Sequence, residues 1–216
     1  MIETHPWQPF IPPKARMLFL GSFPPPEKRH SMPFFYPNLQ NDFWRVMGLI
    51  FFDSPDVFLV PGEKRFDQRK IESFLTQRRI AMYDVGKRVE RLDGNASDNR
   101  LRIVEPVDLS ALLNRIPTCK TIVATGQKAL DEILRQAGAS YARGEDEVMP
   151  STKSDLKTPT SYQEPTLSAL AIGESIHITF NARPITLFRM PSTSRAYPKP
   201  LTYKADMYRR AFSLEN

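Results

Sequence analysis

The sequence predicts an α/β protein with three layers (α/β/α), in which a short, mostly parallel four-stranded sheet is flanked by helices on both faces. Four short apolar runs lie far apart along the chain, at 17–22, 80–85, 121–126 and 185–190. None of them alternates with polar residues, which is typical of parallel strands that are covered on both faces. Segments with helical apolar spacing separate these runs, and that order of elements predicts an open, doubly wound sheet.

The helices are expected where apolar residues recur every three or four positions and so share one face. Four helices are defined in this way by Phe43, Val46, Met47 and Ile50; by Ile71, Phe74 and Leu75; by Leu109, Leu112 and Leu113; and by Ala129, Leu130, Ile133 and Leu134. A fifth helix is expected over 203–212. The segment 175–180, followed by Asn-Ala-Arg-Pro, predicts a hairpin with 185–190 that adds an antiparallel strand to one edge of the sheet.

Two segments show neither strand nor helix periodicity. Segment 138–175 is rich in Ser, Thr, Pro and charge, and we interpret it as a mobile surface insertion in a single domain that spans 1–216. Segment 87–102 is dominated by charge and contains turn-forming residues between Asn95 and Asn99. That composition favours a solvated loop, and the alternative is a loop that lines a cleft and supplies an acid or an amide.

Composition limits the classes of function. The chain has 216 residues, of which 41% are hydrophobic and 25% charged, and these are ordinary values for a globular protein. Its net charge of +6 favours a polyanionic partner such as nucleic acid, the alternative being a protein that is merely basic.

The cysteine and histidine content argues against a metal site or a disulfide framework. Cys119 is the only cysteine, and the three histidines are scattered along the chain, so neither a thiolate cluster nor paired cysteines are available. No secretory signal and no apolar run of the ~18 residues needed for a membrane span is found. We therefore expect a cytoplasmic, nucleoid-associated protein in a reducing compartment.

The loops that follow the predicted strands are the expected ligand site, because the carboxyl ends of parallel strands meet at one edge of the sheet. Gly21 and Ser22 open the first of these loops, GSFPPPEKRH. It lacks the glycine spacing of a P-loop or of a dinucleotide-binding turn, which argues against ATP and NAD. The basic residues at 28–30 either meet phosphates or form a solvated turn. After the third strand, 125–128 opens a helix whose backbone N–H groups face the same edge.

Two further segments carry side chains suited to a nucleotide. In YPNLQNDFW (36–44), Asn41 either caps the following helix or presents an amide beside a bound base. The aromatic run 34–36 lies near basic residues and suits base stacking, with core packing as the competing explanation. At 190–194, the sequence Met-Pro-Ser-Thr-Ser ends a strand with small hydroxyl donors at the sheet edge. The Pro-bounded loop from Arg195 to Lys199 is basic and can reach into a DNA groove.

The motifs resemble those of the uracil-DNA glycosylase superfamily and occur in that family's order. They cover most of the chain outside 138–175 and are GSFPPP (21–26), YPNLQNDFW (36–44), MYDV (82–85), SDNRLRIVEPVDL (97–109), TGQKAL (125–130) and MPSTS (190–194). The nearest branch is that of the hypoxanthine-DNA glycosylase-like proteins, which share an N-x-F-W and an L-P-S-T-S-P element. The resemblance implies a monomeric enzyme that flips a damaged base out of duplex DNA and hydrolyses its N-glycosidic bond without metal or cofactor.

The resemblance also implies roles for individual residues. Asn41 matches the asparagine assigned to catalysis in the hypoxanthine branch, and Tyr36 matches an aromatic residue that stacks on the flipped base. Thr125 falls where many members carry an asparagine that reads the base edge. Together with Ser22 and Phe23 of the first loop, Tyr36 and Thr125 form the expected base-binding set. The expected DNA-binding residues are Ser192, Thr193, Ser194, Arg195 and Lys199. The first three match the motif that contacts the DNA backbone, and Arg195 matches the start of a wedge.

Five residues depart from the family pattern, among them Arg195 and Tyr197, which replace the Pro and Asn of the L-P-S-T-S-P-A-N element. Phe23 stands where the uracil branches carry an activating Asp or Asn, Met190 replaces a His, and Thr125 cannot offer a bidentate amide. Two main hypotheses follow. The first is a glycosylase for hypoxanthine or uracil, and the second is a catalytically degenerate protein of the same fold that acts as a DNA-binding module. A more distant third hypothesis is a site for a free nucleotide or nucleoside.

Overall fold

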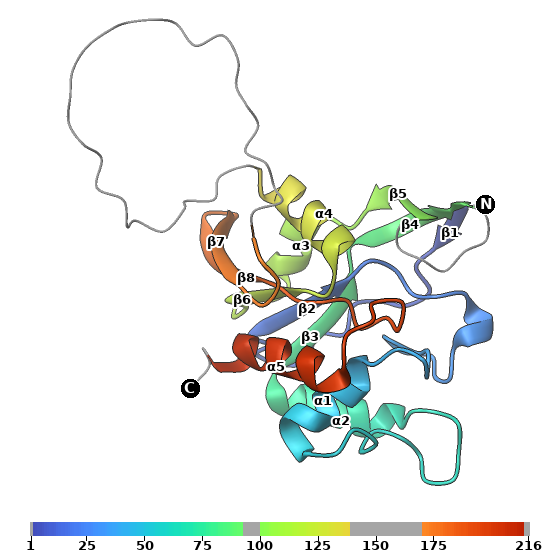
Figure 1. Ribbon diagram of the computed structural model, residues 1–216. Helices are drawn as coiled ribbons and strands as arrows, with labels where there is room; N and C mark the ends of the chain where they lie inside the picture. The colour runs from blue at the N-terminus through green and yellow to red at the C-terminus, as the bar shows by residue number, and fades with distance from the viewer. Residues whose placement is uncertain (1, 93–99, 139–169, 214–216) are drawn as a thin grey trace, which may run out of the picture.

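A computed structural model describes residues 2–92, 100–138 and 170–213 of the protein. Its main sheet has five strands in the order β3-β2-β6-β8-β7 (Figure 1). These strands are β2 (Met17–Gly21), β3 (Ile80–Asp84), β6 (Thr121–Ala124), β7 (Ser175–Phe180) and β8 (Arg183–Arg189). β3, β2, β6 and β8 are parallel, and β7 pairs antiparallel with β8 at the edge. The four predicted parallel strands and the predicted edge hairpin are thus confirmed.

Burial explains why the strands read as continuous apolar runs. Every residue of β2, β3 and β6 is buried, because these central strands are covered by helices on both faces. β7, at the edge, instead mixes exposed and buried positions. Since neighbouring parallel strands are in register, their ends are aligned too: Gly21 lies opposite Asp84 in β3, and Leu20 opposite Ala124 in β6.

All five predicted helices are present and form the two outer layers. They are α1 (Phe43–Phe52), α2 (Gln68–Arg78), α3 (Leu109–Asn114), α4 (Gln127–Ala137) and α5 (Leu201–Phe212). Figure 1 shows α1, α2 and α5 on one face of the sheet, and α3 and α4 on the other. The predicted three-layer architecture is confirmed. None of the helices in the three described ranges is long and apolar enough to cross a membrane.

A second, three-stranded antiparallel sheet was not expected. It contains β1 (Ile2–Thr4), β4 (Gly86–Arg91) and β5 (Leu101–Pro106) in the order β1-β4-β5. The expectation of a solvated loop over 87–102 is therefore wrong for the residues in β4 and at the start of β5. The charge in this segment belongs to cross-strand ion pairs such as Lys87–Glu105, at 2.5 Å, while Val89 faces the interior. Cross-strand pairing of opposite charges stabilises a half-exposed sheet.

Parts of two expectations fall outside the described ranges. The turn-forming residues within 93–99 lie outside these ranges, and so do positions 139–169 of the expected insertion.

Gly48 lies in the interior of α1, at a close approach between this helix and the segment that follows it. A Cβ atom at this position would lie 2.3 Å from the carbonyl oxygen of Ser54 and 3.1 Å from Cγ1 of Val57. We predict that Gly48→Ala lowers the free energy of unfolding by about 1–3 kcal/mol, because the overlap with a backbone oxygen outweighs the gain in helix propensity. Urea denaturation measures this change.

Ser73→Ala on the exposed face of α2 is the control, and its effect should stay within about 0.5 kcal/mol. A Gly48→Ala variant that is more stable than the wild type would show that α1 and the Ser54 segment separate easily, contrary to this description.

Candidate functional site

A cavity of about 460 Å³ opens at the carboxyl edge of the main sheet. Its wall contains Gly21 at the end of β2, Ser22 after it, Asp84 at the end of β3 and Thr125 after β6. β3 and β6 lie on opposite sides of β2. The chain therefore adds β3 on one side of β2 and later adds β6 on the other side. Ligands of open α/β proteins bind at such a switch point, because the loops there diverge and leave a crevice.

Most of the residues expected at the site lie in the wall of this one cavity. Eight of the ten line it, namely Ser22, Phe23, Tyr36, Asn41, Thr125, Ser192, Thr193 and Ser194. The other two, Arg195 and Lys199, lie outside the wall in the exposed loop that follows. Four of the quoted motifs, at 21–26, 36–44, 125–130 and 190–194, thus contribute residues to the wall of one cavity.

Tyr36 is the aromatic residue of the 34–36 run that reaches the cavity. Phe34 and Phe35 are buried in the core, so the core-packing explanation holds for both, and Phe43 is buried as well. The Tyr36 ring stacks on that of Phe43, with centroids 3.9 Å apart and planes 7° apart. Its φ of +51° is uncommon for a bulky residue, and such strained backbone occurs at functional sites where the surroundings hold it.

A hydrogen-bond chain fixes the Tyr36 hydroxyl. The Thr125 hydroxyl lies 3.2 Å from the carbonyl oxygen of Leu20, to which it donates. Because Thr125 has a single hydroxyl proton, the 2.5 Å contact between Tyr36 and Thr125 must be donated by Tyr36. Thr125, expected to read the edge of a base, therefore positions Tyr36 in this structure.

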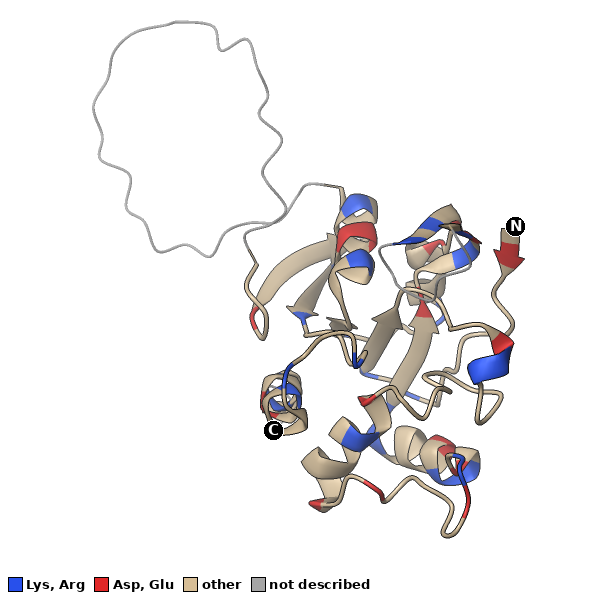
Figure 2. Cartoon of the chain, turned by 45° about the vertical axis from the view of Figure 1, so that its right-hand side comes forward, with Lys and Arg blue, Asp and Glu red and all other residues tan. Residues whose placement is uncertain are grey.

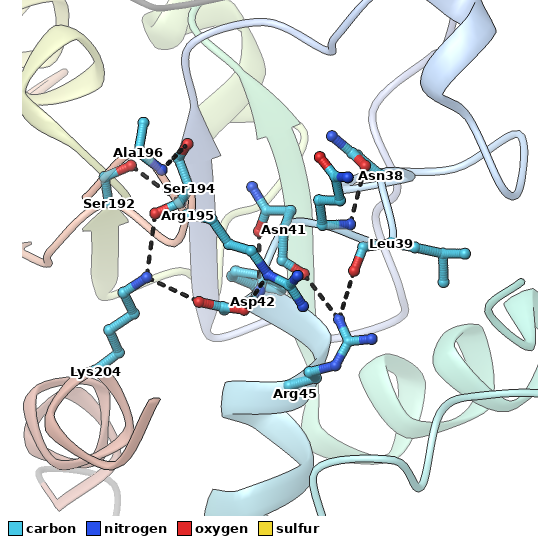
Figure 3. Close-up of polar contacts among 12 residues, drawn as sticks. Asn38, Leu39, Asn41, Asp42, Arg45, Ser192, Ser194, Arg195, Ala196 and Lys204 are labelled. Atoms are coloured by element: carbon cyan, nitrogen blue, oxygen red, sulfur yellow. Dashed lines mark hydrogen bonds and ion pairs between the residues drawn. The ribbon is translucent and has the colours of Figure 1, made fainter. Parts of the chain in front are cut away.

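Asn41 both contacts the start of α1 and lines the cavity. Its side-chain oxygen accepts a hydrogen bond of 2.9 Å from the backbone N–H of Phe43 in the first turn of α1. Because an N–H must point at an oxygen, this contact fixes the orientation of the amide. Figure 3 shows the Asn41 nitrogen on the side away from this bond. Asn41 therefore presents an N–H donor to the cavity, which suits a carbonyl oxygen but cannot take a proton from water.

A buried ion pair aligns α1 with the hydroxyl segment 192–194. Nζ of Lys204, a residue of α5 that is only 1% exposed, lies 2.9 Å from Oδ2 of Asp42 and donates to the carbonyl oxygen of Ser194 at 3.1 Å (Figure 3). The backbone N–H of Asp42 donates to the carbonyl oxygen of Thr193 at 2.9 Å. Asn41, which precedes Asp42, is thereby held beside the serines.

Arg195 also contacts this pair. Its Nε lies 3.5 Å from Oδ1 of Asp42, so the guanidinium is turned back toward α1. Exposed ion pairs of this kind are worth about 0–1 kcal/mol, so Asp42 holds Arg195 only weakly.

Local groups, rather than one uniform field, set the electrostatics at the cavity. Figure 2 shows Lys and Arg interspersed with Asp and Glu over the helices. Lys128, in the first turn of α4, and Arg29, in the 3-10 turn η1 (Glu27–Arg29), line the cavity, and the amino end of α4 adds partial positive charge. Burial is the main cause that raises the pKa of Tyr197, and a hydrogen bond with Tyr203 adds to it. The Tyr197 hydroxyl therefore remains neutral in the cavity wall.

Sequence reasoning gave no role to Asp84 or to His5, which contacts it. Asp84 lines the cavity, and Nε2 of His5 lies 2.9 Å from its Oδ2. The available signal was the lone acid at the end of the apolar run 80–85. In the described ranges, no group of three or more His, Cys, Asp or Glu side chains is placed to hold a metal ion.

The fold has a counterpart among solved structures. The chain matches the solution NMR structure of a protein from Methanosarcina acetivorans that is proposed to be a uracil DNA glycosylase, over 100% of both chains, with a TM-score of 0.56 and 20% sequence identity. At this level of identity the match demonstrates a shared fold, and it agrees with the fold class expected from the sequence. Neither a protein-family model nor a curated protein matches the chain.

The Lys204–Asp42 pair generates a stability prediction. Lys204→Met leaves the Asp42 carboxylate, which is 14% exposed, without its main partner. We predict a loss of about 3–5 kcal/mol in the free energy of unfolding. In the double variant Asp42→Asn/Lys204→Met the loss should be smaller, because no unpaired charge remains. Guanidinium denaturation of the three proteins gives both values.

Arg209→Ala provides the control on the same helix, because its pair with Asp206 is exposed and should be worth less than about 1 kcal/mol. Equal losses for Lys204→Met and Arg209→Ala would contradict a structural role for the buried pair.

Proposed function

We propose that the protein is a DNA glycosylase of the uracil-DNA glycosylase superfamily, nearest the hypoxanthine branch. It flips a deaminated base, hypoxanthine or uracil, into the cavity and hydrolyses the N-glycosidic bond. The observation that carries the proposal is the convergence of four separate motifs on one cavity at the switch point of the sheet. The fold shared with a proposed uracil DNA glycosylase supports it.

The cavity has the groups that an extruded base requires. Its volume of about 460 Å³ falls in the range of small-molecule pockets, and Tyr36 and Phe23 supply aromatic surface for stacking. The N–H of Asn41 can donate to a base carbonyl, which uracil and hypoxanthine both carry. That hydrogen bond strengthens as the base departs with the electron pair of the glycosidic bond, so it lowers the barrier of the chemical step.

The rim has groups that suit the DNA backbone. Ser192 and Ser194 are half-buried hydroxyl residues in the wall, and the amino end of α4 presents backbone N–H groups that favour a phosphate. Arg195 and Lys199 lie outside the wall, where they can reach phosphates on either side of the flipped nucleotide. Extruding a base costs a few kcal/mol, and backbone contacts of this kind offset the cost.

The second candidate function is a DNA-binding module without catalysis. Phe23 favours it, because an apolar ring stands where related enzymes carry the group that activates water. The two functions share the fold and the basic rim, and they differ in whether a bond is broken.

Incubation with labelled duplexes that carry uracil or hypoxanthine, followed by alkali, tests the proposal. We expect a strand break at one of the two bases and a single-turnover rate at least about 100-fold lower for Asn41→Asp. This variant keeps the oxygen that caps α1 but loses the N–H donor, so it separates catalysis from capping.

Asn114→Asp on α3, outside the cavity wall, is the matched control and should cleave at the wild-type rate. DNA binding without a strand break at either base would favour the binding module instead.

DNA affinity should depend on salt through the basic rim. We predict that Lys199→Ala weakens binding to duplexes of any sequence and lowers the slope of log K against log[salt] by about one, because one phosphate contact is lost. Fluorescence anisotropy over a series of salt concentrations measures both quantities. Lys120→Ala, an exposed lysine that precedes β6 at the opposite edge of the sheet, is the control, and an equal effect of the two substitutions would argue against a localised DNA-binding rim.

A further inference from the structure

The cavity contains a carboxylate to which the sequence analysis gave no role, although it stands in the MYDV motif (82–85). Asp84 ends β3 and is 6% exposed, yet it lines the cavity. A Cβ atom at Gly21 would lie 2.3 Å from Oδ1 of Asp84 and 3.0 Å from the hydroxyl oxygen of Tyr36. Only glycine at position 21 therefore lets this carboxylate oxygen and the Tyr36 hydroxyl approach the end of β2 together.

The other oxygen of this carboxylate is held by His5. Nε2 of His5 lies 2.9 Å from Oδ2 of Asp84, and the imidazole is 1% exposed. Four aromatic rings surround it with centroids 4.8–6.0 Å away, those of Trp7, Phe23, Phe35 and Tyr83. The ring has little freedom to turn, so it fixes the plane of the carboxylate.

The second nitrogen of His5 contacts the backbone of Trp7. Nδ1 is 3.2 Å from the backbone nitrogen of Trp7 and 2.9 Å from its carbonyl oxygen. An ionised Asp84 carboxylate can only accept, so Nε2 is the donor in the 2.9 Å contact with Oδ2. With that proton on Nε2, Nδ1 accepts from the Trp7 N–H in the neutral imidazole and donates to the Trp7 carbonyl in the charged one.

Burying a carboxylate is unfavourable unless its surroundings compensate for the lost hydration. The dyad therefore needs an explanation beyond packing, and the reaction provides one. Cleavage of an N-glycosidic bond passes through a sugar with positive charge at C1′, and a nearby carboxylate stabilises that charge. Asn41 presents a donor and Phe23 is apolar, so neither of them can serve as this anion.

We propose that Asp84 is the catalytic carboxylate of this site and that His5 is its positioning residue, an inference that rests on the proposed glycosylase function. The C1′–N bond breaks and its electron pair leaves with the base. A water oxygen bonds to C1′, and one proton of that water passes to Oδ1 of Asp84. Asp84 returns the proton to solvent, and the departed base takes one up, so that water and the nucleotide yield a free base and an abasic sugar.

Single-turnover cleavage of the duplex that the wild type cuts tests the role of Asp84. We expect Asp84→Asn, which keeps an acceptor oxygen for His5, to lower the rate at saturating enzyme by about 100-fold or more. Its DNA dissociation constant should stay within about threefold of the wild-type value, because a carboxylate that acts on the transition state adds little to ground-state binding. Asp108→Asn, which leaves a side-chain oxygen to cap α3, is the matched control at wild-type rate.

Binding of a cationic analogue supplies a measurement independent of turnover. A duplex with a pyrrolidine in place of the target nucleoside mimics the charged sugar, and one with a tetrahydrofuran is its neutral counterpart. The wild type should prefer the cation by about tenfold or more, and Asp84→Asn should lose that preference, because transition-state mimics report on groups that stabilise developing charge. Asp84→Glu keeps the charge but moves it, so it should retain part of the preference for the cation. It replaces Asp84→Asn in this measurement if Asp84→Asn unfolds.

His5→Gln tests positioning. It should slow cleavage in the wild-type background but add little in the Asp84→Asn background, because both act through one group. A purely structural role predicts additive losses and an unchanged preference for the cationic duplex.

The outcomes separate the two proposals. A wild type that cleaves neither substrate refutes the proposed function. Cleavage that survives in Asp84→Asn at the wild-type rate, with the preference for the cation intact, refutes the role of Asp84 and leaves the glycosylase in place.

Discussion

The arrangement of the site depends on one buried charge, the ammonium group of Lys204. Because an unpaired ammonium in the interior is costly, the structure must bring acceptors to it, and it does so from two distant segments. The Asp42 carboxylate comes from the start of α1 and the Ser194 carbonyl from the loop before α5. Satisfying this single group sets the distance between the segment of Asn41 and the serines of the rim, which neither segment could set alone.

The parts of the structure that could be predicted from the sequence are those that local pattern controls. Continuous apolar runs are compatible with few arrangements other than strands covered on both faces, and the parallel order of such strands sends their following loops to one edge. That is why Ser22, Asn41 and Ser192 could be expected in one cavity although they come from distant parts of the chain. The edge hairpin of β7 and β8 was predictable for the same reason, since its two apolar runs are separated by a turn.

The features that could not be predicted depend on pairing between distant residues. β4 and β5 carry their charges as cross-strand pairs, and a run of charge looks the same in sequence whether or not a partner strand exists. The His5–Asp84 contact spans 79 positions and involves two residues whose individual contexts are unremarkable. Side-chain orientation is equally invisible: the sequence shows an amide at Asn41, but only the N–H of Phe43 decides which end of that amide faces the cavity.

The contact between Asp42 and Lys204, 162 positions apart, has a consequence for the order of events during synthesis. A ribosome makes the chain from the amino end, and domains begin to fold as they emerge. The strands and helices that hold Tyr36, Asn41 and Thr125 can assemble before residue 204 leaves the exit tunnel, but the loop of Ser194 cannot yet be anchored to α1. The nascent protein therefore passes through a stage in which its sheet is complete and the loop of Ser194 is not yet anchored.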